Sequence, residues 1–307
     1  MSWQDNVISI VIPTYKRPAA LKRLLTSIDG SQVDGFDLEI VIADNDPLAS
    51  ANDVIVAFME TSVSKIIHLH VPEPGVSNAR NGALEAANGR YILFIDDDME
   101  ADRDWAKILF TGAQKFDATL AFGPAFAVMP EAGNALFDYM QPLFCRVRDY
   151  ETGLINEGIA TGNCYLDRGK ETLPEPVFDP TLNTSGGEDD ALFNHLMQQG
   201  AKVAWIEDAI TFEHVPAQRA TLSYVWRRNF AWGQGPTKHA AEKGFKGVPE
   251  VFKWMAVGVV QTGIYFTLWT ISKLMSRPKS VQHFGRLAQG VGKVFWAQRL
   301  SPKLYGV

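Results

Sequence analysis

The chain has 307 residues, 46% of them hydrophobic and 21% charged, which excludes a disordered protein and is enough for a sizeable core. The two cysteines, Cys145 and Cys164, fit no metal-binding or redox spacing.

The net charge of −6 is unevenly distributed: residues 243–307 hold ten Lys or Arg and one acid, Glu250, so this segment is +9 and the rest is −15. A basic segment on an acidic chain predicts an anionic partner, either nucleic acid or a membrane surface. The many Trp and Phe residues of the segment favour the membrane and no nucleic acid.

Apolar runs of strand length alternate with helix patterns through the first hundred residues. We expect strands at residues 7–12, 38–43, 66–71 and 91–95, and helices at 18–28, 51–59 and 77–87. Fully apolar strands that alternate with helices are typical of a mostly parallel sheet with both faces covered. The sequence therefore predicts an α/β fold.

Polar clusters follow three of these strands. They are Pro13-Thr14-Tyr15-Lys16-Arg17, Asp44-Asn45-Asp46 and Asp96-Asp97-Asp98. Ligands of such sheets bind beyond the carboxyl ends of the strands. Adjacent carboxylates repel one another, and Mg²⁺ or Mn²⁺ with a substrate diphosphate would relieve this repulsion. We therefore expect a metal–diphosphate site after residue 95; a solvated acidic loop is the alternative.

Four further sites carry candidate chemistry. Glu188, Asp189 and Asp190 open a predicted helix, whose dipole keeps a carboxylate ionised and able to accept a proton; simple helix capping is the alternative. His214 ends a short extended segment, 211–214; it is either a structural histidine or, with the acids, a further metal ligand. Arg80 lies at the start of the helix after Gly75, where phosphate oxygens bind well. Arg227 and Arg228 are either diphosphate contacts or part of a solvated face.

The C-terminal region contains two apolar patterns. Residues 254–271 carry no formal charge and are marginally long enough to span a bilayer, so a re-entrant or interfacial helix is also open. Residues 281–295 have apolar side chains at helical spacing with basic residues between or beyond them, which indicates an amphipathic basic helix. Two ordinary core-packing helices are the alternative.

Taken in order, these motifs resemble the family 2 glycosyltransferases, which have a GT-A fold and a nucleotide-sugar donor. The likeness covers roughly residues 6–240 and includes Gly75-Val76-Ser77-Asn78-Ala79-Arg80-Asn81 and Gly187-Glu188-Asp189-Asp190. The layout is most similar to bacterial exopolysaccharide enzymes of the succinoglycan type. The Gln-x-x-Arg-Trp signature of processive synthases is absent, which argues for the addition of a single sugar.

The resemblance implies roles for individual residues. Asp189 is implied as the catalytic base with Glu188 beside it, and Asp98 and His214 as metal ligands. The implied donor-binding residues are Pro13, Thr14, Tyr15, Arg17, Asp44, Arg80, Asp96 and Asp97, with Asp44 on the uracil ring.

The resemblance also implies a function and a place in the cell. We expect an inverting enzyme that uses Mn²⁺ or Mg²⁺ to move one sugar, glucose by the narrower likeness, from a UDP-sugar to a lipid-linked or oligosaccharide acceptor in cell-surface polysaccharide synthesis. A GT-A domain at 1–240 and a membrane-associating helical region at 241–307 would place it at the cytoplasmic face of the inner membrane, peripherally or by a single C-terminal anchor. A nucleotidyltransferase acting on sugar phosphates and a non-catalytic sugar-binding protein are the alternatives.

Overall fold

The computed structural model describes residues 3–131, 133–183, 186–277 and 279–302. The chain divides into two compact units: Met1–Ala127 with Cys145–His214, and Val128–Phe144 with Val215–Val307. The border at residue 214 differs from the predicted domain boundary at 240. The reason is that helix α7 (Leu222–Glu242) packs closely on helix α9 (Ser280–Val294). The functional division into 1–240 and 241–307 stays a prediction, and residues 1–2 and 303–307 lie outside the described residues.

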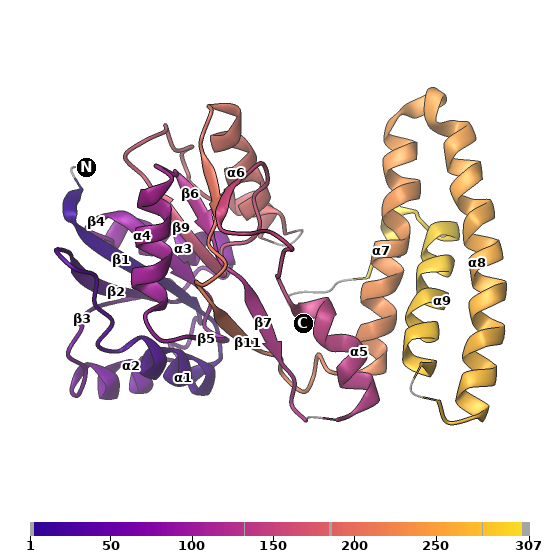
Figure 1. Ribbon diagram of the computed structural model, residues 1–307, viewed down its shortest axis with the longest axis horizontal. Coiled ribbons are helices and arrows are strands. Elements are labelled where there is room, and N and C mark those ends of the chain that lie inside the picture. The colour runs from indigo at the N-terminus through magenta and orange to yellow at the C-terminus, as the bar shows by residue number, and fades with distance from the viewer. Residues whose placement is uncertain (1–2, 132, 184–185, 278, 303–307) are drawn as a thin grey trace. The chain divides into compact units, whose positions relative to one another are not determined.

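The first unit is built on an eight-stranded sheet with a smaller three-stranded sheet (Figure 1). In spatial order the large sheet consists of β3 (Lys65–His70), β2 (Asp37–Asp44), β1 (Gln4–Thr14), β4 (Gly89–Ile95), β9 (Asn163–Asp167), β6 (Leu120–Phe122), β10 (Val203–Trp205) and β8 (Gly153–Ile155). Only β9 and β8 run antiparallel to their neighbours. The small sheet has the order β5 (Met99–Ala101), β11 (Thr211–His214) and β7 (Ala125–Val128). The prediction of a mostly parallel sheet is confirmed.

Helices cover both faces of the large sheet, as predicted. On one face lie α1 (Pro18–Ile28), α2 (Asn52–Met59) and α4 (Trp105–Lys115). On the other lie α3 (Val76–Ala86) and α6 (Glu188–Gln198). Each helix buries a stripe of apolar side chains against the strands, and burial of this apolar surface is the main force that holds the layers together.

The register of the strands brings the polar clusters to one edge. Strands β1, β2 and β4 are parallel neighbours, with Thr14 opposite Asp44 and Val11 opposite Phe94. The segments that follow β1, β2 and β4 therefore leave the sheet on the same side, which is the side where α/β sheets bind ligands.

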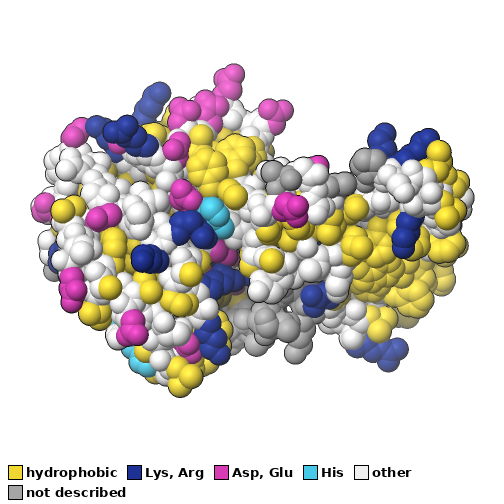
Figure 2. All heavy atoms as spheres, turned by 90° about the horizontal axis from the view of Figure 1, so that it is seen from below, with side chains coloured by type: hydrophobic (Ala, Val, Ile, Leu, Met, Phe, Trp, Pro, Cys, Tyr) yellow, Lys and Arg dark blue, Asp and Glu magenta, His cyan; other side chains and the backbone are white. Residues whose placement is uncertain are grey.

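The second unit consists of helices α5 (Ala135–Phe144), α7, α8 (Val248–Leu274) and α9 (Ser280–Val294). Glycines allow the helices to pack closely: a Cβ at Gly292 would lie 2.1 Å from the Phe230 carbonyl oxygen, and one at Gly258 would lie 2.8 Å from the Gly290 carbonyl oxygen. The helix over Gly244–Leu274 is long and apolar enough to cross a membrane, by length and composition, and only 6% of its apolar window is buried. Figure 2 shows a broad area of hydrophobic side chains on this helical unit, with Lys and Arg at its margins.

Candidate active site

The Asp96-Asp97-Asp98 run is tied to the end of strand β1. The Asp97 carboxylate accepts hydrogen bonds from Thr14 Oγ1 at 2.9 Å and from Arg17 Nη1 at 3.0 Å. Arg17 Nη1 also lies 2.7 Å from Asp98 Oδ2. Burial raises the pKa of Asp97 to about 6, although the nearby Arg17 guanidinium lowers it. Asp97 is thus an interior residue that joins β4 to β1, and Arg17 is the cation between two carboxylates.

Asp96, the first carboxylate of the run, is linked through Arg80 to the second acidic motif, which begins at Glu188. Arg80 Nη1 lies 2.7 Å from Glu188 Oε1, and Arg80 Nη2 lies 3.3 Å from Asp96 Oδ1. The Arg80 side chain is only 6% exposed and its guanidinium carbon is 5.4 Å from the ring centre of Phe178. The structure therefore brings together three predicted site residues that are far apart in the sequence.

A loop before α6 makes this meeting possible. Asn183 Oδ1 accepts the backbone N–H of Ser77 at 2.8 Å, and the Asn81 side chain exchanges two hydrogen bonds with the Phe178 backbone. The start of helix α3 therefore holds the segment that leads to Glu188. Gly75, at φ 144°, leaves room for this contact, since a Cβ there would lie 2.3 Å from the Asn183 side chain.

Asp189 follows Glu188 in the first turn of α6. Burial raises the pKa of its carboxyl group, and the negative charge of Glu188 raises it further, whereas Arg80 lowers it. One of its oxygens accepts the backbone N–H of Asp190 at 2.9 Å. A carboxylate with a raised pKa at the edge of a ligand site is suited to accept a proton from a hydroxyl group.

Asp44 and its neighbours shape the loop after β2. Asp44 is fully buried, and its two carboxylate oxygens accept the backbone N–H groups of Asp46 and Ala51 at 3.0 and 2.9 Å. The Asn45 side chain donates to the carbonyls of Val71 and Glu73. Asp44 therefore organises the loop in the structure, and its predicted contact with a uracil ring stays a prediction.

The other predicted donor residues lie at the end of β1. Pro13 is within the strand, whereas Tyr15 is 44% exposed beyond it. The chain turns at Lys16, whose φ of 55° is uncommon for a residue other than glycine, and continues to Arg17. An exposed aromatic ring at the carboxyl end of a strand is available to a ligand.

His214 lies beside the acid run through its backbone. Its N–H donates to the Asp98 carbonyl oxygen at 2.9 Å, while its imidazole Nε2 lies 2.7 Å from Glu100 Oε2. Strand β11 pairs antiparallel with β5, which carries Glu100. The structure thus pairs the His214 ring with Glu100, and its predicted role as a metal ligand stays a prediction.

Arg146 is a site residue that the sequence did not indicate. It forms an ion pair with Glu213 at 2.8 Å. Burial alone would lower the pKa of Arg146, but the negative charges of Glu213, Asp96 and Asp98 outweigh that effect and raise it. Arg146 thus adds a third guanidinium beside the acid run.

Arg227 and Arg228 belong to the helical unit, where Arg228 lies over the rings of Phe144, Tyr224 and Trp232.

Gly162 gives a test of how tightly this site is packed. A Cβ at this position would lie 2.7 Å from Asp96 Oδ2 and 3.0 Å from Arg146 Nη2. Because both neighbours are site side chains, we expect Gly162→Ala to weaken binding of the predicted nucleotide ligand about tenfold, close to 1.4 kcal/mol, with little loss of thermal stability. Calorimetric titration with UDP measures the change. Gly153→Ala is the control, since its Cβ would meet nothing closer than 3.8 Å; equal affinity in both variants would contradict the prediction.

The carboxylates after β4 offer oxygen donors of the kind that divalent cations bind. In the described part of the chain, no three His, Cys, Asp or Glu side chains are grouped to hold a metal ion. Mg²⁺ and Mn²⁺ often use only one or two protein carboxylates and take their other ligands from phosphates and water. Asp98 and Asp96, which follow β4, are hard oxygen donors of this kind, and Arg17 is the competing cation at Asp98.

Comparisons with known proteins show which family and fold this chain shares. The family model "Glycosyl transferase family 2" matches residues 9–168. The succinoglycan biosynthesis protein ExoM of Rhizobium meliloti (strain 1021) is 29% identical over 242 residues, which cover 77% of this chain and 76% of ExoM. The minor teichoic acid biosynthesis protein GgaB of Bacillus subtilis (strain 168) is 24% identical over 226 residues, 73% of this chain and 25% of GgaB. The chain thus spans only a quarter of that larger relative.

Solved structures share the fold at low sequence identity. The mannosyltransferase PcManGT from Pyrobaculum calidifontis, in complex with GDP-Man and Mn²⁺, has a TM-score of 0.55 and 17% identity, and the match covers 96% of this chain and 88% of that one. GalNAc-T7 with UDP, GalNAc and Mn²⁺ has a TM-score of 0.51 and 16% identity, covering 76% and 51%. These likenesses confirm the predicted GT-A fold. Because the family model matches more than half of the chain and the motifs lie at the ligand-binding edge of this fold, the chain belongs to glycosyl transferase family 2.

Proposed function

We propose that the protein is an inverting glycosyltransferase that moves a single sugar from a UDP-sugar to an acceptor in bacterial exopolysaccharide synthesis. The sugar that we propose is glucose. The observation that carries the proposal is the Arg80 bridge, which joins Asp96 of the acid run to Glu188, the neighbour of Asp189. In this proposal, the donor-binding edge and the proton acceptor are parts of one site. ExoM, whose name assigns it to succinoglycan biosynthesis, supports the choice of pathway class.

Different residues of the chain would have different roles in the reaction. Asp189 accepts the proton of the acceptor hydroxyl as its oxygen bonds to the anomeric carbon. The bond from that carbon to the diphosphate breaks on the opposite side, so the anomeric centre inverts and UDP leaves. Arg17, Arg80 and Arg146 contribute positive charge near the acid run.

Asp98, helped by Asp96 and in the family likeness by His214, would hold Mn²⁺ or Mg²⁺. When bound, such a cation offsets the negative charge that develops on the departing diphosphate. The solved relatives that contain Mn²⁺ support this part of the proposal through their fold.

A panel of nucleotide sugars tests the function. We expect free UDP and a glycosylated acceptor from UDP-glucose with Mn²⁺, and much slower reaction with GDP-mannose. Pyrophosphate as the product would indicate nucleotidyl transfer, and the absence of turnover with every donor would indicate a sugar-binding protein. Either result would overturn the proposal, although family membership favours glycosyl transfer over both.

Asp98→Ala tests the cation site separately. In the wild-type protein we expect Mn²⁺ to strengthen UDP binding at least about tenfold, close to 1.4 kcal/mol. In the variant this gain should disappear, because Asp98 is the main carboxylate that the proposal gives to the cation, and Asp96 is shared with Arg80. Calorimetric titrations of UDP with Mn²⁺ and with a chelator give the comparison, and Asp102→Ala, in an exposed aspartate of the same segment, is the control. An undiminished gain in Asp98→Ala would remove Asp98 from the site.

We also place the protein at the cytoplasmic face of the inner membrane. The long apolar helix α8 and the basic charge of residues 243–307 support a membrane surface as partner. In this proposal the UDP-sugar is made and used in the cytoplasm, so the enzyme that binds it lies on the cytoplasmic side of the membrane.

A further inference from the structure

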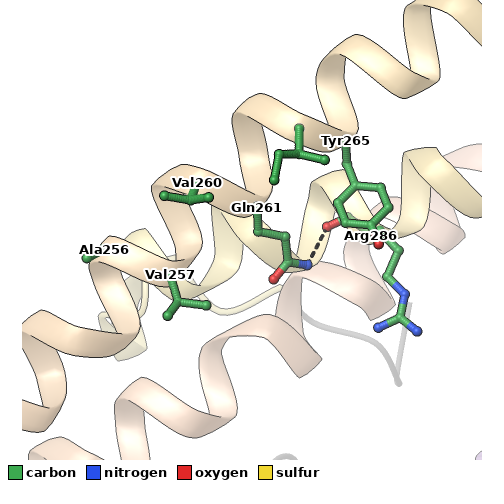
Figure 3. Close-up of a pocket in the computed structure, with 7 residues that line it drawn as sticks. Ala256, Val257, Val260, Gln261, Tyr265 and Arg286 are labelled. Atoms are coloured by element: carbon green, nitrogen blue, oxygen red, sulfur yellow. Dashed lines mark hydrogen bonds between the residues drawn. The ribbon is translucent and has the colours of Figure 1, made fainter.

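Arg286 of helix α9 lies between two grooves of the helical unit. The first groove, of about 510 Å³, runs along α8 past Val257, Val260 and Ile264 (Figure 3). The second groove, of about 370 Å³, lies among α5, α7 and α9. Arg286 lines both grooves, so one cation borders two chemically different spaces.

The first groove is apolar and open to the outside. Val260 is 61% exposed and Ile264 is 52% exposed, although both are aliphatic. The Gln261 side chain faces α9, where its Nε2 donates to the Arg286 carbonyl oxygen at 2.8 Å (Figure 3). Its Oε1 accepts from Lys293 Nζ at 3.0 Å. An exposed, largely aliphatic groove in which the Gln261 amide is already paired is suited to a hydrocarbon chain.

The guanidinium of Arg286 is available to an anion. The side chain is exposed, and among the described residues no carboxylate lies within ion-pair distance of it. Its recorded hydrogen bond, to Gln289 Oε1, is long at 3.4 Å. Guanidinium groups bind phosphate oxygens in a bidentate manner, so the charge and geometry of Arg286 match a phosphate group.

The second groove offers hydrogen-bonding groups. Tyr139, Asn229, Gln282 and Gln289 line it, together with the ring of Trp232 and the carboxylate of Asp138, which can accept a hydrogen bond from a sugar hydroxyl. Gln289 Nε2 donates to Asn229 Oδ1 at 2.8 Å, which holds both amides in place. Amide and phenol groups both donate and accept, as the hydroxyl groups of a sugar require.

The packing of α9 on α8 favours an interfacial position of the two helices over a position in which α8 spans the bilayer. The two helices are joined by the Gln261–Arg286 bond and by Ser272 Oγ and His283 Nδ1 at 2.8 Å, so α9 lies beside the apolar part of α8. If α8 crossed the hydrocarbon core, Arg286 and Lys293 would be carried into it at a high cost in free energy. An interfacial position keeps the apolar face of α8 in lipid and these cations among the headgroups.

We propose that Arg286 and the two grooves form a binding site for a lipid-linked acceptor. The hydrocarbon chain would lie in the groove along α8, the phosphate at Arg286, and the first sugar in the polar groove. The inference rests on the proposed function and deepens it, because it selects a lipid phosphate over a free oligosaccharide as the acceptor.

Vesicle binding of the full-length protein tests this site. The probes are phosphatidylcholine vesicles that contain either a long-chain polyprenyl phosphate or phosphatidylglycerol at equal surface charge. We expect the wild-type protein to bind the polyprenyl phosphate vesicles about ten times more tightly. Arg286→Gln should lose this preference and Arg286→Lys should keep part of it. Arg277→Gln, which removes an exposed charge outside both grooves, should weaken binding to both vesicles equally and keep the preference.

Two results would overturn the site. Equal binding of the wild-type protein to both vesicles would show only a membrane-binding surface, and an unchanged preference in Arg286→Gln would show that the phosphate binds elsewhere. Thermal unfolding of each variant confirms that it is folded. The assay contains no donor, so a failure of the donor panel would contradict the proposed function without changing the vesicle result.

Discussion

Replacement of Asp189 by asparagine is expected to lower kcat at least about a thousandfold and to leave the affinity for the UDP-sugar within about twofold. Asparagine has nearly the same shape but cannot accept a proton from the acceptor hydroxyl. The donor is expected at the carboxyl ends of β1, β2 and β4, where no part of the Asp189 side chain is needed for binding. Single-turnover rates and donor titrations of the same preparation separate the two effects.

Asp190→Asn is the matched control. It makes the same chemical change one residue further along α6, at an exposed side chain. The backbone N–H of Asp190, which binds Asp189, is unaffected. We expect its kcat to stay within about threefold of wild type. If both variants lose activity equally, the effect comes from the acidic helix start as a whole; if Asp189→Asn keeps near-normal turnover, Asp189 is not the base.

The pH dependence of kcat should carry the same signature. Burial, together with the charge of Glu188, raises the pKa of Asp189 in the folded protein. A base acts only when ionised, so activity should fall as the pH drops through a pKa higher than that of an ordinary aspartate. Glu188→Gln removes the second of these causes and should move the acid limb of the profile to lower pH. A limb that stays in place would assign it to another group.

The sheet and its polar edge could be predicted because both depend on local sequence. The apolar runs at 7–12, 38–43, 66–71 and 91–95 locate β1 to β4 within three residues at each end. Parallel strands place their carboxyl ends on one side, so the clusters that follow them meet without further information. The helix start at Glu188 was predictable for the same reason, since a glycine pair precedes an acidic turn.

The partners within the site depend on tertiary contacts that no local pattern indicates. The pairing of Arg80 with Glu188 depends on Asn183 and Asn81, whose polar side chains bind backbone groups far away in the sequence. Arg146 comes from a stretch of short mixed runs, and its position beside the acids depends on its ion pair with Glu213 and its backbone bridge to Ala125. The partner of His214 was missed because the three-residue strand that carries Glu100 is too short to give a period.

Replacement of Arg80 by methionine should have the largest combined effect on stability and turnover. The variant leaves the carboxylates of Asp96 and Glu188 without their shared cation in a largely buried position. Removal of one partner from a buried ion pair typically costs about 3 kcal/mol, so we expect a loss of this size in the free energy of unfolding. Chemical denaturation measures the stability, and UDP release measures a turnover that we expect to be undetectable. Arg80→Lys should recover part of the stability and little of the activity, because an ammonium group does not span both carboxylates.

Arg90→Met separates stability from catalysis. Arg90 binds Asp167 through Nε at 2.7 Å and Nη2 at 3.0 Å, so this variant also leaves a buried carboxylate unpaired, but between β4 and β9 and outside the proposed site. A similar loss of stability with normal turnover in Arg90→Met would show that destabilisation alone does not abolish the reaction. The lost activity of Arg80→Met would then come from the bridge between the acid run and the base. If the folded Arg80→Met protein had a normal turnover rate, the Arg80 bridge would be a structural feature only. The proposal that this bridge joins the donor site to the base would then fail.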